Sequence, residues 1–177
     1  MNAVTAGRPD PSEYTPYYSA YVAQVDTDDI VSALRGQLDE LLGFVGHLDP
    51  VTADHRYAAG KWSVKEVIGH VVDSERIFGY RALAIARGER RTLPGFEQDD
   101  YVAEGEFTRR SLQSLADEFD HVRRSNLALF ESLSADQWMR IGEANEAPIS
   151  VRAIAWILVG HAKHHVAVIR ERYLGTA

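Results

Sequence analysis

The chain has 177 residues, 45% of them hydrophobic and 25% charged, a composition that predicts one globular domain with a sizeable core. Its net charge of −7 argues against nucleic-acid binding, because phosphate backbones attract basic surfaces, and the absence of cysteine excludes disulfides, thiolate metal ligands and a cysteine nucleophile. Residues 1–10 lack a signal-peptide profile and the longest apolar run, residues 153–160, is too short to span a bilayer, so we expect a cytoplasmic protein with no nucleic-acid and no membrane partner.

An irregular arm, residues 1–25, is predicted to precede a single domain formed by residues 26–177. The arm contains three prolines and four tyrosines: Tyr14, Tyr17, Tyr18 and Tyr21. A frayed tail is the alternative, but such tails are usually poor in aromatic residues. We therefore expect the tyrosines to pack on the domain.

Four long amphipathic segments follow, each opened by a residue that can cap a helix. Thr27 or Asp28 is the expected N-cap of the first, and serines open the others, in one case as the capping box Ser63-Val64-Lys65-Glu66. The predicted helices are 27–48, 63–87, 111–132 and 150–173, with a short helix at 134–138. No stretch alternates like a β-strand, and residues 142–148 are expected to form a loop. The pattern predicts an all-α fold, a four-helix bundle with a long loop between its second and third helices.

That long loop, residues 89–108, is of a length that is often functional. Its acidic segment 93–101 either roofs a pocket or is a solvated linker. Two aromatic residues in the segment, Phe96 and Tyr101, favour docking against the domain.

His161 and His165 lie four residues apart within an apolar helical stripe near the C-terminus. At roughly 100° of rotation per residue, both share a face with Ile157, Leu158 and Val168. Imidazoles one turn apart on a buried face are costly unless their ring nitrogens find partners. A divalent ion is one such partner, because histidines at i and i+4 can reach a single ion.

A metal centre needs a third ligand, and His70 is the best candidate among the remaining histidines. It lies in the second helix, on the flank of the apolar face, from where it can still point across the bundle. His164 points about a quarter turn away from the pair, towards a supporting or surface position. Three neutral imidazoles suit Zn²⁺ or Ni²⁺ and leave a coordination position open. Hydrogen-bonded core histidines without a metal are the alternative.

Two acidic residues near His70 are candidates for supporting chemistry. Glu75 falls in the centre of the apolar face of its helix, where a carboxylate must be paired, protonated or close to a cation. It is either a polar tie to Arg123 or Asn126 of the third helix, or a support for a ligand histidine. Asp73, one turn from His70, is either a general base or a solvated surface acid.

At these residues the chain resembles the DinB-like superfamily and, within it, the YfiT-like branch. The matching segments are Lys61-Trp62-Ser63, residues 69–75 and residues 160–165, and the resemblance covers residues 14–173. It implies an up-down-down-up four-helix bundle, often a homodimer, with nickel or zinc held by His70, His161 and His165. It also implies hydrolysis, or transfer and isomerisation that use a low-molecular-weight thiol such as bacillithiol or mycothiol.

The sequence therefore predicts a small metalloenzyme with a small-molecule substrate. The open position on the metal would activate water in a metal-dependent hydrolase, or a low-molecular-weight thiol co-substrate in an S-transferase. The alternative is a non-enzymatic, metal-stabilised ligand-binding or interaction module, in which the ion mainly locks helices together.

Overall fold

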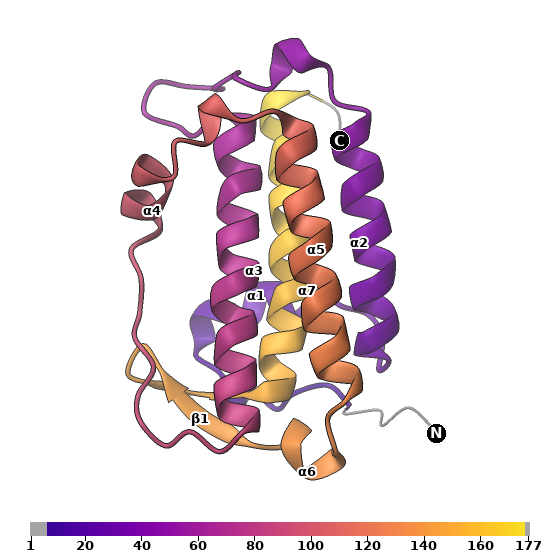
Figure 1. Cartoon of the computed structure of the whole chain (residues 1–177), viewed down its shortest axis with the longest axis vertical. Helices are drawn as coiled ribbons and strands as arrows, with labels where there is room; N and C mark the ends of the chain where they lie inside the picture. Colours follow the sequence, from indigo (N-terminus) through magenta and orange to yellow (C-terminus); the bar gives the residue numbers. More distant parts are fainter. Residues whose placement is uncertain (1–6, 176–177) are drawn as a thin grey trace.

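Four long helices form the body of the molecule: α2 (Ile30–Gly46), α3 (Val64–Ala86), α5 (Leu112–Glu131) and α7 (Val151–Val168) (Figure 1). The computed structural model describes residues 7–175, so residues 1–6 of the predicted arm and residues 176–177 of the predicted domain lie outside it. The predicted all-α four-helix bundle is confirmed. The shorter elements are the 3-10 turns Pro11–Glu13, Pro16–Tyr18, Pro50–Thr52 and Phe107–Arg109, the helices α1 (Ser19–Val22), α4 (Gln98–Glu104) and α6 (Ala135–Trp138), the strands β1 (Ile141–Ala144) and β2 (Ala147–Ser150), and the π-helical turn Ile169–Tyr173.

Side-chain caps fix where the long helices begin. The Ser63 hydroxyl accepts the Glu66 N–H at 3.3 Å, and the Glu66 carboxylate accepts the Ser63 N–H at 2.6 Å, so the predicted capping box opens α3. Ser150 caps α7 with a single hydrogen bond, which its hydroxyl accepts from the Ala153 N–H at 3.0 Å. The start of α2 was predicted too early, because its cap is Asp29, which accepts from the Ser32 N–H at 3.1 Å.

The bundle has an up-down-down-up topology, in which α2 and α7 run one way and α3 and α5 the other (Figure 1). Each of α3 and α2 packs against both α5 and α7. Because α3 and α5 are consecutive yet parallel, the chain must return along the 23 residues of α3, a distance of about 35 Å. The long loop makes this return and carries α4 on the outside of the bundle, which is the physical reason for its length.

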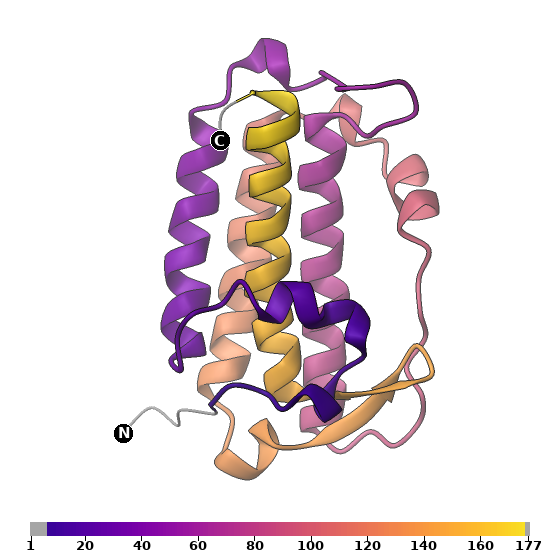
Figure 2. The same cartoon turned by 180° about the vertical axis from the view of Figure 1, so that it is seen from behind.

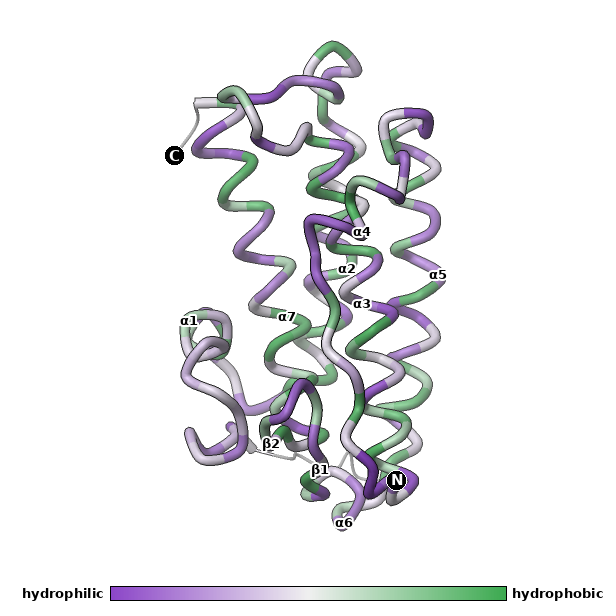
Figure 3. Tube along the Cα trace, turned by 90° about the vertical axis from the view of Figure 1, so that its left-hand side faces the viewer, coloured by the Kyte–Doolittle hydropathy of each residue, from purple (hydrophilic) through white to green (hydrophobic). Residues whose placement is uncertain are grey.

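Apolar and polar residues alternate along each long helix (Figure 3), and the apolar ones form the core between the four helices. Helix α7 differs from the others because residues 153–162 are all buried. The extra cover comes from the N-terminal arm, whose helix α1 crosses the outer side of α7 (Figure 2). Gly160 permits this approach, since a Cβ atom there would lie 2.0 Å from the Tyr21 carbonyl oxygen. The described part of the arm therefore packs on the domain, although Tyr17, one of its four tyrosines, is 68% exposed.

A β-hairpin replaces the loop that we expected at residues 142–148. Strands β1 and β2 pair antiparallel, with Ile141 opposite Ser150 and Ala144 opposite Ala147. The two-residue turn, Asn145 and Glu146, has φ angles of 53° and 61°, the left-handed conformation of hairpin turns. The expectation of a loop was wrong. These short strands lack the alternating β-branched residues that usually indicate a strand, and proline is tolerated at Pro148 because β2 is an edge strand.

Leu93 attaches the long loop to this hairpin. Its N–H donates to the Glu143 carbonyl oxygen and its carbonyl oxygen accepts from the Asn145 N–H, both at 2.9 Å. The loop is thus anchored rather than a free linker. Within residues 7–175 no helix is both long and apolar enough to cross a membrane.

Candidate metal centre

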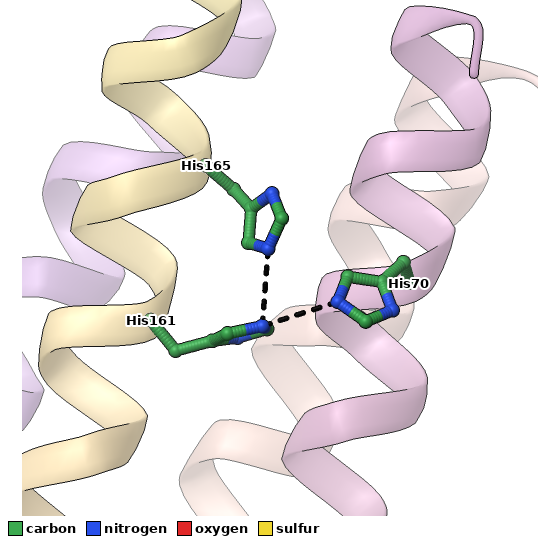
Figure 4. Close-up of side chains that lie close together, drawn as sticks. All are labelled: His70, His161 and His165. Atoms are coloured by element: carbon green, nitrogen blue, oxygen red, sulfur yellow. Dashed lines mark hydrogen bonds between the residues drawn. The ribbon is translucent and has the colours of Figure 1, made fainter. Parts of the chain in front are cut away.

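His70 of α3 and His161 and His165 of α7 point at one another across the groove between the two helices (Figure 4). The Nε2 atom of His161 lies 3.1 Å from the Nε2 atoms of both His70 and His165. One ring nitrogen from each histidine lies within 4.8 Å of those of the other two. The structure thus brings together the three histidines that the sequence predicted as ligands.

Burial keeps these imidazoles neutral. His70 and His161 are 3% and 7% exposed, and His165 is partly buried. Desolvation lowers the pKa of His70 to about 4 and that of His165 to about 3. The pKa of His161 falls well below its ordinary value, because of burial and then because of the neighbouring His165 and His70. At neutral pH all three rings therefore offer lone pairs, the form that binds metal ions.

The geometry of the three nitrogens fits a divalent ion better than a hydrogen-bonded cluster. Two imidazole nitrogens can share one proton, but the single lone pair or N–H of His161 Nε2 cannot satisfy two partners at once. Tetrahedral zinc with Zn–N distances of 2.0–2.1 Å separates its ligand nitrogens by about 3.4 Å. The two separations of 3.1 Å are close to that value.

Aromatic rings surround the cluster. Trp62 lies 4.9 Å from His70, ring centre to ring centre, and its carbonyl oxygen accepts a hydrogen bond from Tyr173 at 2.7 Å. Tyr21 of α1 lies edge-on to both His161 and His164, at 5.4 Å from each ring. Burial raises the pKa of Tyr21 to about 12, so its hydroxyl stays protonated. The arm and the loop before α3 thus limit the access of water to the histidines.

A cavity of about 450 Å³ opens beside the cluster, with His70 and His161 in its wall. Its other walls come from the arm, from α3, from the long loop and from the hairpin. The segment 93–101 therefore roofs a pocket, which was one of the two alternatives predicted for this segment. Its lining includes Tyr18, Tyr21, Ser74, Phe78, Arg81, Phe96 and Glu97.

Glu75 forms the polar tie that was one of its two predicted roles. Its carboxylate accepts two hydrogen bonds from Arg123, both at 2.8 Å, and a third from Asn126 at 2.9 Å. Glu75 is 2% exposed and the Arg123 side chain 0%. In the part of the chain that the structure describes, no hydrogen bond joins Glu75 to any of the three histidines, so its support of a ligand stays a prediction.

Asp73 lies on the same helix but outside the lining of the cavity. Its surroundings are charged: Glu118, Arg76 and Arg110 are its electrostatic neighbours. Burial raises the pKa of its carboxyl, and the negative charge of Glu118 raises it further. The carboxyl is half-buried, and both roles considered for Asp73, a general base and a solvated surface acid, stay predictions.

Sequence reasoning missed Ser74, Phe78 and Arg81, which line the cavity beside His70. A signal was present, because His70, Ser74, Phe78 and Arg81 follow one another at spacings of four, four and three residues and so share one face of α3. The pairing of this face with the arm and the hairpin could not be read from a helical pattern.

Fold and geometry together define the class of this protein: a four-helix bundle with a three-histidine candidate metal centre in the groove between two helices. The chain belongs to the DinB superfamily, whose family model matches residues 33–169. A search of curated proteins finds no match.

Two solved structures share this fold. YfiT from Bacillus subtilis, described as a probable metal-dependent hydrolase with an unusual four-helix bundle topology, is 19% identical with a TM-score of 0.75, and the alignment covers 85% of this chain and 88% of YfiT. A mycothiol-dependent maleylpyruvate isomerase is 11% identical with a TM-score of 0.67 over 82% of this chain. This chain spans 61% of the isomerase's length.

Proposed function

We propose that this protein is a small metalloenzyme in which His70, His161 and His165 hold a Zn²⁺ or Ni²⁺ ion. The observation that carries the proposal is the convergence of three neutral imidazoles beside a cavity, of which His70 and His161 are buried and His165 is partly buried. Two relatives of the same fold support it, since one is described as a probable metal-dependent hydrolase and the other as mycothiol-dependent. The reaction is hydrolysis, or transfer of a low-molecular-weight thiol.

A divalent ion bound by three imidazoles would lower the pKa of a water or thiol at its open position and so supply a nucleophile at neutral pH. The residues of the chain divide the remaining work. His70, His161 and His165 stay neutral because they are buried, and Trp62 and Tyr21 restrict water around them. The cavity holds the small-molecule substrate. Because the chain has no cysteine, a thiol nucleophile would have to come from a co-substrate.

A second candidate function follows from the position of the ligands on two different helices. An ion shared by α3 and α7 would cross-link them, which suits a non-enzymatic, metal-stabilised ligand-binding or interaction module. The variant His165→Ala separates the two functions. A structural ion predicts loss of the fold, whereas a catalytic ion predicts a folded bundle with weakened metal binding, measured by melting and metal analysis of one sample.

The setting that we propose is cytoplasmic, as a homodimer without nucleic-acid or membrane partners. A net charge of −7 argues against a nucleic-acid partner and the absence of cysteine fits a reducing compartment, whereas the homodimer rests on the family resemblance alone.

A turnover screen tests the proposed reaction. Wild-type protein is offered electrophiles with and without a low-molecular-weight thiol, and esters with water alone. We expect turnover that disappears in His161→Ala and persists in His121→Ala, a variant of an exposed histidine on α5. Thiol-dependent turnover identifies a transferase and thiol-independent turnover a hydrolase. Equal rates in wild type and His161→Ala would contradict the proposal.

A further inference from the structure

Arg81 places a positive charge in the wall of the cavity. The residue is only 3% exposed and lies on α3, one turn beyond Phe78. One guanidinium nitrogen donates to the Pro94 carbonyl oxygen at 2.7 Å. The guanidinium carbon lies 5.3 Å from the ring centre of Phe78 and 6.0 Å from that of Phe96. A neutral carbonyl, two aromatic faces and a hydrogen bond with the Tyr18 side chain hold this cation, but none of these groups balances its charge.

The other deeply buried arginine shows what is missing at Arg81. Arg123 donates two hydrogen bonds to the Glu75 carboxylate and another to the Gln37 side-chain oxygen at 2.7 Å. Across residues 7–175 no aspartate or glutamate forms an ion pair with Arg81. Glu97, the acidic residue in the cavity lining, is exposed and forms no ion pair with Arg81. Since buried charges are costly unless paired, Arg81 is left with the capacity to bind an anion.

The rest of the lining restricts the kind of anion. Arg81 is the only arginine or lysine among the residues that line the cavity, and Glu97 lies at the same cavity. One positive charge beside one negative charge favours a monoanion over a doubly charged phosphate. A guanidinium forms paired hydrogen bonds with a planar carboxylate. Phe78, Phe96 and the tyrosines of the arm offer apolar and aromatic surface to the remainder of such a molecule.

We propose that the cavity binds a small organic carboxylate, with its carboxylate on Arg81 and its apolar body between Phe78 and Phe96. His70 and His161 line the same cavity, so the far end of the ligand would face the histidine cluster. A small organic carboxylate is thus the substrate class that we infer for the proposed metalloenzyme. Binding of the carboxylate to Arg81 is independent of that function, and only the reaction at the other end of the ligand rests on it. A volume of about 450 Å³ accommodates a molecule larger than benzoate.

Binding of benzoate and of its neutral analogue benzamide tests the proposal on the full-length protein as purified. We expect calorimetric titration to show that the wild type binds benzoate at least about tenfold more tightly than benzamide. Arg81→Met should lose this preference, because the apolar side chain keeps the packing and removes the charge. The matched control is Arg87→Met, which removes the same charge from an exposed position outside the cavity. Phenyl phosphate should bind more weakly than benzoate.

Metal content measured on the same samples locates the anion. Loss of the preference in Arg81→Met at unchanged metal content supports the assignment to Arg81. A preference that survives in Arg81→Met means that the carboxylate sits elsewhere, on the metal for example, and overturns the proposal. Equal binding of benzoate and benzamide to the wild type overturns the proposal as well. Tighter binding of phenyl phosphate than of benzoate would also overturn it, because the preferred ligand would then be a phosphate and not a carboxylate.

Folding and the proposed metalloenzyme function are controlled separately. If Arg81→Met does not fold by circular dichroism, Arg81→Gln and Arg81→Lys take its place. The glutamine variant should lose the preference and the lysine variant should keep part of it, and any other order counts against the proposal. Absence of metal and of turnover in the wild type would refute the metalloenzyme while leaving the benzoate preference to be decided on its own.

Discussion

Glu75→Leu should strongly destabilise the bundle. The substitution removes the carboxylate that accepts two hydrogen bonds from Arg123 and one from Asn126, and leaves the guanidinium with the Gln37 oxygen as its only side-chain acceptor. Because the Arg123 side chain is 0% exposed, water does not replace the lost partner. Breaking a buried pair from one side costs about 3–5 kcal/mol. For a domain of this size, that lowers the melting temperature by about 10 °C.

Urea denaturation followed by circular dichroism measures this loss, and a double-mutant cycle assigns it. Arg123→Met in the Glu75→Leu background removes the uncompensated charge, so we expect the double variant to regain at least about 2 kcal/mol over Glu75→Leu. Glu40→Leu, an exposed glutamate on α2, should change the stability by less than about 0.5 kcal/mol. A cost below about 1 kcal/mol for Glu75→Leu, or a double variant less stable than either single one, would refute the reasoning.

Three further predictions concern the site and its cover. In metal-free protein, the free energy of unfolding should be highest above about pH 6.5 and should fall by about 1.4 kcal/mol per pH unit for each of these histidines as the pH drops towards 4. The reason is that the folded-state pKa values of His70 and His165 are about 4 and 3, so the unfolded chain takes up protons first. A free energy of unfolding that does not change with pH in urea titrations would contradict this. If Asp73 is a general base, Asp73→Asn should lower turnover by about 10²–10⁴-fold at unchanged metal content, and a change below about tenfold removes the role. Gly160→Ala should cost about 1–3 kcal/mol and expose the arm to proteolysis, since its Cβ atom would meet the Tyr21 carbonyl; an arm still protected would show that the contact is not essential.

The sequence predicts the bundle well because its signals are local. Serine caps and apolar stripes mark the helices, and the spacing of His161 and His165 fixes their shared face regardless of the rest of the fold. His70 was predicted on the flank of its helix, and the groove between α3 and α7 is where such a flank position faces a neighbour. Local patterns were sufficient wherever a helix face alone decided the outcome.

The walls of the cavity depend on contacts between distant segments, which local patterns do not encode. The turn at Asn145 and Glu146 takes a left-handed backbone without the glycine that usually signals it. Arg81 looks like an ordinary charged residue of a long helix until the segment 93–101 folds over it. The role of Glu75 required knowledge of which helix packs against α3, and α5 supplied Arg123.

Metal analysis of purified protein tests the central claim most directly. Elemental analysis, with circular dichroism to verify folding, is made on the wild type, on His161→Ala and on the control His121→Ala. Convergence of His70, His161 and His165 predicts one divalent ion per chain in the wild type and in His121→Ala, and a folded His161→Ala protein with little or none. A folded wild type that binds no divalent ion after incubation with zinc or nickel, or a His161→Ala variant that retains the full content, would contradict it.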